Sequence, residues 1–398
     1  MHVATAPETE RLRPLVEHLA AIERAPCSAG EREAAEWIAE RFRELGLRTR
    51  IEEETVHGTF FRPLGLLAAL GALGGVAGLR GRRLVGALAG GFAAASMWED
   101  LSGGTRRWFR RRLRQEPTWN VVAEAGDPAA ERTLVILAHH DAARTSFIFD
   151  PTVPRLVAKK TPWLIERMDR WPALMRLVFG GPALVAAGSV LRSRRALAAG
   201  TVLSAGSAAV MADMARQDVV PGANDNLTGV AALVELGRLL AESPPQGLRV
   251  LLVSAGSEEA NQEGILAFAR RHFDSLPKDT TSFICLDTLG SGELVVLEGE
   301  GFLRMREYPA PMKELISESA EHEGVHLRRG LRLTYATDGL IPLRAGYPTA
   351  SICSVDEYLL PSNYHSPTDT PDRVDYECVA QGVRMVHAAT RRLAESDA

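Results

Sequence analysis

The sequence contains few cysteines, and they are not spaced for pairing or for binding metal. Its 398 residues include four, Cys27, Cys285, Cys353 and Cys378, with no Cys-x-x-Cys pair among them. Disulfide-rich domains and cysteine zinc sites both need closely patterned cysteines, so the spacing argues against both. We expect the four thiols to be buried and free.

The sequence also lacks a basic excess and a secretion signal. The net charge is −4 and the pI is about 6.2, so the chain has no overall basic character that would suit nucleic acid, and no nucleic-acid partner is expected. Residues 1–25 carry charges throughout and contain no apolar stretch, so no cleaved export signal is predicted. The length suits one large domain or two ordinary ones.

No uninterrupted apolar run reaches the ~20 residues that a membrane-spanning helix needs. Four runs of about 15 to 17 residues come close, and short arginine-rich turns join them into two hairpins rich in Gly and Ala. Small residues of this kind allow close helix packing. The four runs are 63–79, 84–98, 177–191 and 196–212.

Two interpretations of these hairpins stay open. Membrane association through residues 61–98 and 171–212 is favoured, because Trp98, Trp108 and Trp171 lie near the run ends, where interfacial aromatic residues belong. The alternative is a small soluble four-helix cap beside the active site.

The distribution of basic residues predicts an orientation for a membrane protein. Arg106 to Arg114, Lys159, Lys160, Arg167 and Arg170 lie on the side of the hairpins that joins the rest of the chain, whereas each hairpin tip carries three arginines. The positive-inside rule then places the catalytic part in the cytoplasm. A soluble cytoplasmic protein is the alternative.

The remaining sequence alternates between strands and helices, which predicts an α/β fold. We expect a mostly parallel, mixed central sheet covered by helices on both faces, with the apolar helices inserted as a subdomain. The predicted catalytic domain comprises residues 1–58, 117–145 and 218–398. The predicted insertions are residues 59–116 and 146–217.

Polar residues follow several predicted strands directly, at the sheet edge where α/β proteins bind ligands. The apolar run 134–138 ends in His139 and Asp141, and a carboxylate beside a histidine orients the ring of a metal ligand. His140 is expected to point to the other face. A histidine at a strand end is more often an ordinary surface residue, so this motif alone is weak.

Four further segments carry acids or a histidine at the end of a predicted strand, at the start of a helix or in a loop. Asp225 opens a predicted helix, where it either caps that helix or bridges two metals. The pair Glu258 and Glu259 follows a buried strand and supplies the two roles of a hydrolytic metal site, a ligand and a general base. Asp287 ends another apolar strand, and His365 lies in a loop. Together these imidazole and carboxylate groups favour zinc.

The motif set resembles the M28 family of metallopeptidases. It consists of His139-x-Asp141, Gly-Ala-x-Asp225-Asn226-x-x-Gly229, Glu258-Glu259, Leu286-Asp287 and Tyr364-His365. The resemblance implies a zinc-exopeptidase-like fold and an aminopeptidase that hydrolyses N-terminal peptide bonds of a peptide substrate.

The family's site residues carry over one by one. The resemblance implies one zinc on His139 and Asp287, a second on Glu259 and His365, and Asp225 bridging both. A water between the two zinc ions would attack the peptide, with Glu258 as general base and Asp141 orienting His139. The family also implies a cis peptide between Asp225 and Asn226.

Two departures from the family pattern stand out. Residues 146–217 separate His139 from Asp225 far more than is usual, and Asn261 replaces the glycine that follows the glutamate pair. Other amide-processing enzymes of the same fold, a carboxypeptidase or a glutaminyl cyclase, remain alternatives. A catalytically silent membrane module is the third, although no expected ligand is missing.

Overall fold

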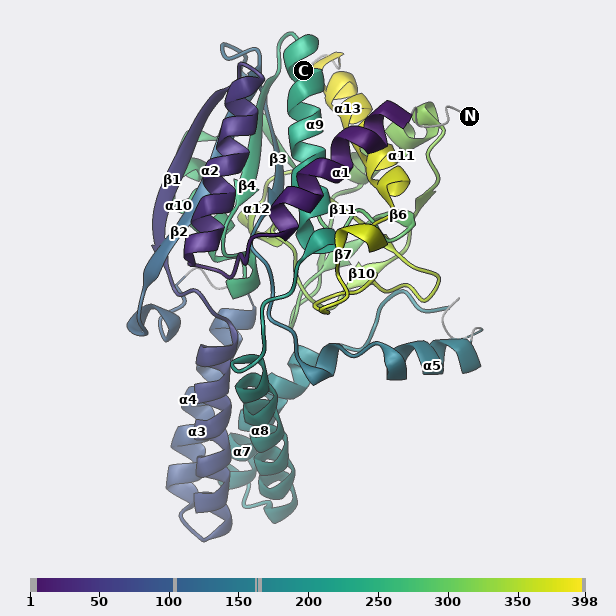
Figure 1. Cartoon of the computed structure of the whole chain (residues 1–398). Helices are drawn as coiled ribbons and strands as arrows, with labels where there is room; N and C mark the ends of the chain where they lie inside the picture. The colour runs from purple at the N-terminus through teal and green to yellow at the C-terminus, as the bar shows by residue number, and fades with distance from the viewer. Residues whose placement is uncertain (1–5, 103–105, 162, 164–166, 396–398) are drawn as a thin grey trace.

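The computed structural model describes residues 6–102, 106–161, 163 and 167–395 of the chain. It consists of an α/β body and a bundle of four helices that extends from one end of that body (Figure 1). The first five residues of the N-terminal segment discussed above lie outside the described residues.

The body is built on an eight-stranded mixed sheet with the strand order β1-β2-β4-β3-β5-β11-β6-β9. Strands β4, β3, β5 and β11 run parallel in its centre, and the edge pairs β1/β2, β2/β4 and β11/β6 are antiparallel. The strands are β1 Arg48–Val56, β2 Glu116–Gly126, β3 Thr133–His139, β4 Arg249–Ala255, β5 Thr281–Leu286, β6 Glu293–Val296, β9 Leu327–Arg328 and β11 Thr349–Val355. A small second sheet contains β7 Gly299–Glu300, β8 Arg306–Glu307 and β10 Arg332–Leu333.

Helices cover both faces of the large sheet because its central strands are apolar on both sides. Along β3, Leu134 and Ile136 pack into one core while Val135 and Leu137 pack into the other, as the two-residue period of a strand requires. The first core lies under α1 Ala6–Ala20, α2 Ala29–Glu44, α9 Thr228–Glu242, α11 Ala310–Glu323 and α13 Tyr376–Glu395. The second lies under α10 Glu263–His272 and α12 Leu340–Ala345. The predicted fold class is therefore confirmed.

The register of the central strands brings three strand ends together. His139, the last residue of β3, pairs with Ala255, the last residue of β4, and Leu137 pairs with Cys285 near the end of β5. Parallel strands present their carboxyl ends at one edge of a sheet, so the loops after β3, β4 and β5 share one side of the body.

The four apolar helices pack against one another as a bundle (Figure 1). They are α3 Phe61–Leu79, α4 Arg83–Leu101, α7 Leu174–Val190 and α8 Arg194–Met214. Close approach of the backbones depends on glycine: a Cβ at Gly90 would lie 2.7 Å from the Ala186 nitrogen and 2.8 Å from the Pro182 oxygen. The helices are longer than the predicted runs, because α3 begins at Phe61 and α4 continues through Trp98 to Leu101.

The outer surface of the bundle is apolar. Large hydrophobic side chains are exposed on all four helices, among them Leu73, Leu88, Leu184 and Val202. At 1.5 Å per residue, the 19 residues of α3 span about 28 Å, close to the ~30 Å of a bilayer's hydrocarbon core. Among the described helices, α3 and α8 are long and apolar enough to cross a membrane.

A separate short helix lies beside the base of the bundle. Helix α5, Thr152–Lys160, runs roughly across the bundle direction where the bundle joins the body (Figure 1). It exposes Val153, Leu156 and Val157, and ends with Lys159 and Lys160.

Two neighbouring glycines of α4, Gly90 and Gly91, test the packing of the bundle, because only Gly90 lies against another helix. We expect Gly90→Ala to destabilise the chain by about 1–3 kcal/mol, because the added methyl meets backbone atoms of α7 that cannot move independently. Gly91→Ala places its methyl in open space. That variant is expected to be neutral or to stabilise by up to about 1 kcal/mol, because alanine is the better helix former. Unfolding followed by circular dichroism measures both; equal behaviour of the two variants would contradict the observed helix packing.

Candidate metal centre

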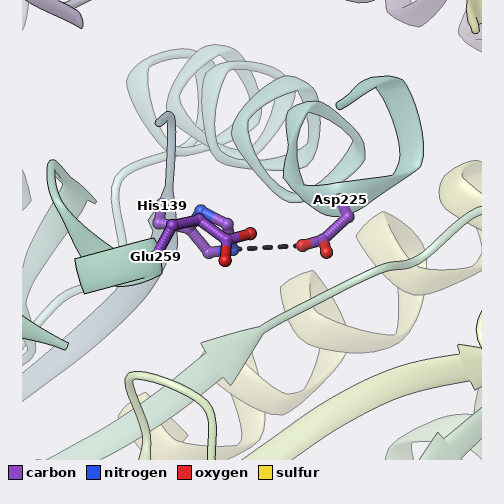
Figure 2. A group of neighbouring side chains, drawn as sticks. All are labelled: His139, Asp225 and Glu259. Carbon is purple, nitrogen blue, oxygen red and sulfur yellow. Dashed lines mark ion pairs between the residues drawn. The ribbon is translucent and has the colours of Figure 1, made fainter. Parts of the chain in front are cut away.

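The five predicted ligands come from five separate segments of the chain, at or near the shared edge of the sheet. Ligand atoms of His139, Asp225 and Glu259 all lie within 4.8 Å of one another (Figure 2). His139 ends β3, Asp225 lies in the turn Ala223–Leu227 before α9, and Glu259 lies in the short turn after β4. The three side chains point toward one another.

Asp225 lies between the two histidines. Its Oδ1 is 3.3 Å from Nε2 of His139, and its Oδ2 is 3.3 Å from Nε2 of His365. Oδ2 is buried and has no hydrogen-bond partner among the described residues. A carboxylate whose two oxygens face two different imidazoles has the arrangement needed to bridge two cations.

His365 completes a second group around Asp225. Its Nε2 lies 3.2 Å from Oε1 of Glu259, so one imidazole nitrogen faces two carboxylates. The ring stacks on Tyr364, with centroids 3.9 Å apart, and meets Phe149 edge-on at 4.5 Å. These aromatic contacts fix the orientation of the imidazole.

Asp287 is also buried at this edge of the sheet. Burial, followed by the charge of Asp225, raises the pKa of Asp287 to about 7. The charges of His139 and His365 act on it in the opposite direction. Asp287 is thus electrostatically part of the same cluster.

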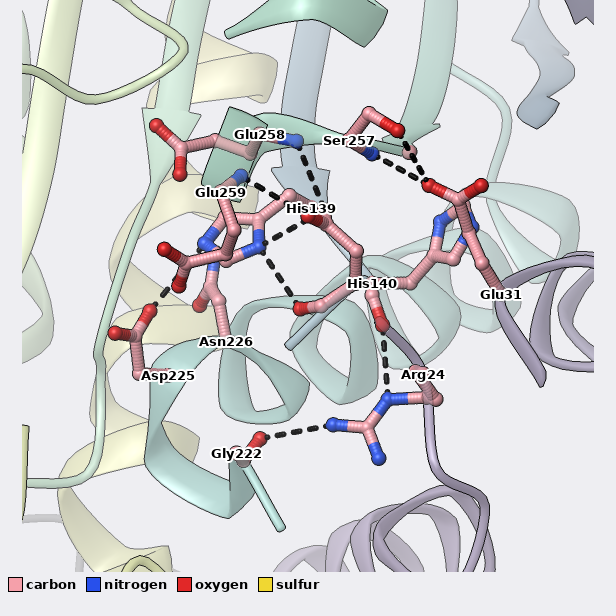
Figure 3. A network of polar contacts seen from close by, with 12 residues as sticks. Arg24, Glu31, His139, His140, Gly222, Asp225, Asn226, Ser257, Glu258 and Glu259 are labelled. Carbon is pink, nitrogen blue, oxygen red and sulfur yellow. Dashed lines mark hydrogen bonds and ion pairs between the residues drawn. The ribbon is translucent and has the colours of Figure 1, made fainter. Parts of the chain in front are cut away.

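The turn that carries Glu258 and Glu259 is held by two buried acids (Figure 3). Glu31 accepts hydrogen bonds from the backbone and hydroxyl of Ser257, at 2.6 and 2.9 Å. Asp141 accepts the backbone N–H groups of Glu258 and Glu259, each at 2.9 Å. The turn needs this support because Ser257 has a φ of +50°, a conformation that is costly outside glycine.

Asp141 therefore has a broader role than the sequence suggested. Its carboxylate lies 3.5 Å from Nδ1 of His139, and its own carbonyl oxygen lies 3.3 Å from the same nitrogen. It thus contacts the imidazole and anchors the glutamate pair at once. His140 points elsewhere and contacts Ser254 through Nδ1 at 2.9 Å.

The Asp225 turn is held by Asp369 and Arg24, neither of which the sequence analysis selected. Asp369 accepts the backbone N–H groups of Asn224 and Asp225 at 2.8 and 3.0 Å. The buried Arg24 donates to the His140 carbonyl on one side and to the carbonyls of Pro221 and Gly222 on the other (Figure 3). It thereby joins the loop after β3 to the turn of Asp225. The Asp225–Asn226 peptide is cis, as the family resemblance implied.

Asp338 is the other acid that the sequence did not reveal. Its side chain is buried, and neither carboxylate oxygen has a hydrogen-bond partner among the described residues. Burial raises its pKa well above the ordinary value, the nearby His139 lowers it, and Asp141 and Asp287 raise it. Asp338 follows no apolar run that would have marked it, whereas Asp369 lies close after His365 in the sequence.

Glu258 faces the open side of the centre. Burial raises the pKa of its carboxyl group well above the ordinary value, while the nearby charge of His139 lowers it. Its Oε1 accepts a hydrogen bond from Gln262 Nε2 at 3.2 Å. Both Glu258 and Glu259 line a cavity of about 440 Å³ that opens beside them.

The chemistry of the donor set fits zinc. Burial opposes protonation of His139, but hydrogen bonds to Asp141 and Asp225 outweigh it and raise its pKa. Both histidines thus lie in a strongly negative environment, in which the buried acids outnumber the cations around them. Imidazole and carboxylate ligands are those that zinc takes in catalytic sites, and a bound cation would offset this buried charge.

The glutamate turn is also tied to the helical bundle. Asn261 has a φ of +74°, a conformation that asparagine tolerates better than most residues. Its Nδ2 donates to the Asp100 carbonyl of α4 at 3.2 Å. Arg110 donates to both carboxylate oxygens of Asp100 and to the carbonyl of Ala260. The asparagine that departs from the family pattern therefore connects the candidate site to α4.

Comparison with known proteins agrees with this geometry. The profile of peptidase family M28 matches residues 205–390. No curated protein matches the sequence. Many solved structures share the fold.

Two of these structures show the range of activities found on the fold. The zinc aminopeptidase BSAP from Bacillus subtilis superposes with a TM-score of 0.57 at 14% identity, over 97% of this chain and 95% of that one. A glutaminyl cyclase from Bacteroides thetaiotaomicron, bound to N-acetylhistamine, gives 0.57 at 14% identity, over 96% and 97%. At such identity the likeness shows the shared fold alone. The segment 205–390 is thus similar to peptidase family M28, and the whole chain shares the fold of the zinc aminopeptidase.

Proposed function

We propose that the protein is a two-zinc aminopeptidase that hydrolyses N-terminal peptide bonds. The observation that carries the proposal is the position of Asp225, whose two oxygens face His139 and His365 separately. In this arrangement His139 and Asp287 would hold one zinc, Glu259 and His365 would hold the other, and Asp225 would be shared by both. Bound zinc supplies a Lewis acid that polarises a carbonyl group and lowers the pKa of water.

The proton transfers fall to Glu258. It is buried at the edge of the cavity and next to the proposed ligand Glu259. Glu258 takes a proton from the attacking water and returns it to the leaving amine, so that an amide and water give a carboxylic acid and an amine. Asp141 and Glu31 hold the turn that places this carboxylate.

Two alternatives share part of the supporting evidence. A glutaminyl cyclase has the same fold, and its superposition is as good as that of the aminopeptidase. Asp225 between two histidines, with Asp287 beside it, favours two metals and therefore the hydrolase. A silent module without metal is disfavoured because His139 and His365 would offset only part of the charge of the buried acids.

We further propose that the bundle, formed by parts of the insertions 59–116 and 146–217, associates with a membrane. The exposed leucines of α3, α4 and α7 support this, since soluble proteins rarely expose apolar faces of this extent. The basic residues near the base of the bundle favour a cytoplasmic catalytic domain. A soluble cap is the alternative, with the same helices packed beside the site.

Replacing the proposed base tests the reaction. We expect Glu258→Gln to bind zinc normally and to lose about 10²–10⁴-fold in kcat on leucine amide, because only proton transfer is removed. Glu33→Gln, at an exposed glutamate on α2, is the control and should keep full activity. Near-normal turnover by the zinc-loaded Glu258→Gln enzyme would refute the assignment.

Elemental analysis tests the metal assignment independently of activity. The wild-type chain is expected to hold two zinc ions, His365→Ala one, and Asp225→Asn fewer than either, because Asp225 is shared by both positions. Equal zinc contents of the two variants would show that Asp225 does not bridge.

Fractionation tests the membrane proposal. The expressed chain is expected to remain with the membrane pellet after a carbonate wash. A variant with glutamate in place of Leu73, Leu88, Leu184 and Val202 should appear in the supernatant, because these exposed side chains form the lipid-facing surface. Recovery of the wild-type chain in the soluble fraction without detergent would establish the cap instead.

A further inference from the structure

The cavity beside Glu258 is larger and more apolar than one amino-acid side chain requires. Its volume is about 440 Å³, within the ~300–1,000 Å³ of sites that hold whole small molecules. This is room for on the order of fifteen water-sized groups. At one end are the candidate site residues Glu258, Glu259 and His365.

Other walls of the cavity come from the bundle and from the segment around α5. Leu64 of α3, Leu101 of α4 and Leu174 of α7 line the cavity from the bases of their helices. Ile148 and Pro154 contribute from the segment that ends in α5. The cavity thus runs from the candidate metal centre to the junction of the bundle and α5.

The apolar lining of the cavity favours a hydrocarbon chain over an extended peptide. An extended peptide carries an N–H and a C=O at nearly every residue, and these groups need hydrogen-bond partners when they are buried. Most of the walls are instead side chains such as Leu331, Leu333, Phe302 and Trp171, which offer few such partners. A hydrocarbon chain has no polar groups to satisfy and gains free energy from each methylene that is buried.

We propose that this cavity binds the hydrocarbon chain of an amphiphilic amide whose scissile bond lies against Glu258 and His365. The inference rests on the proposed hydrolase function and narrows its substrate class to amides with a long alkyl or acyl chain. Water adds to the carbonyl carbon, the C–N bond breaks, and the proton ends on the amine. The products are therefore a carboxylic acid and an amine, one of which keeps the chain.

The cavity lies where a substrate could enter it from a lipid bilayer. Long-chain amides partition into bilayers, and the base of the bundle and α5 form the part of the protein that would lie at the bilayer surface. A substrate can then move from the membrane into the cavity with its chain leading, while its polar end stays near the metal centre.

The first experiment measures chain-length dependence with the zinc-loaded full chain in phosphatidylcholine nanodiscs. Leucine alkylamides place the chain on the amine, and N-acyl leucine amides place it on the carbonyl side. In at least one series we expect kcat/KM to rise on the order of 100-fold between butyl and dodecyl chains. A dependence within about threefold in both series would overturn the proposal. Absence of any hydrolysis, including that of leucine amide, would instead refute the hydrolase function.

A pair of variants tests where the hydrocarbon chain of the substrate binds. Leu174 and Leu177 lie one turn apart on α7 and are 51% and 53% exposed, but only Leu174 lines the cavity. Leu174→Asp is expected to reduce the dodecyl-to-butyl ratio of kcat/KM at least tenfold, because it places a charge where the chain lies. Leu177→Asp should retain the wild-type ratio. Equal ratios in the two variants would overturn the location.

A binding measurement keeps the inference testable without turnover. Octylamine, a product-like ligand, is expected to raise the melting temperature of wild type and Leu177→Asp more than butylamine does, because it binds the native cavity. The difference should vanish in Leu174→Asp. The same nanodiscs are used throughout, so partitioning into the lipid cancels. An unchanged difference in Leu174→Asp would contradict the proposed site.

Discussion

Buried negative charge is the constraint on which the site depends. Asp225, Asp287 and Asp338 are buried around His139 and His365, with Glu259 beside them, and burial of so many carboxylates is costly unless cations accompany them. His139 and His365 supply part of the compensation, and their elevated pKa values reflect the field of the acids: that of His365 is about 10, although burial opposes it. A bound cation would supply the remainder and would couple the stability of the edge loops to the proposed chemistry.

The loops around this cluster are held by polar groups that lie behind it. Arg24 joins two loops through their carbonyl oxygens, Asp369 holds the Asp225 turn, and Glu31 holds the glutamate turn, each through hydrogen bonds of 3.3 Å or less. Burial lowers the pKa of Arg24 to about 10, so it remains charged at neutral pH. Because every hydrogen bond here joins segments distant in sequence, a fixed site geometry requires the complete tertiary fold.

The bundle is joined to the site rather than merely attached to the body. Asn261 and Arg110 link the glutamate turn to Asp100 at the end of α4, and the ion pair of Arg110 with Asp100 is almost fully buried. The bases of three bundle helices also line the cavity that opens beside Glu258. The bundle and the glutamate turn are therefore in direct contact, and both form walls of the cavity beside Glu258.

The sequence by itself determined the fold class, the strand ends and the residue types of the site. Continuous apolar runs specify the central strands. The site residues His139, Asp225, Glu258, Glu259, Asp287 and His365 lie at the ends of such runs or in loops whose chemistry is recognisable locally. Only the tertiary structure identified Arg24, Asp338 and the cavity. Their significance depends on contacts across many positions, on which side chains lack partners, and on space left between elements. None of these properties is encoded in a local pattern, because each results from how distant segments pack.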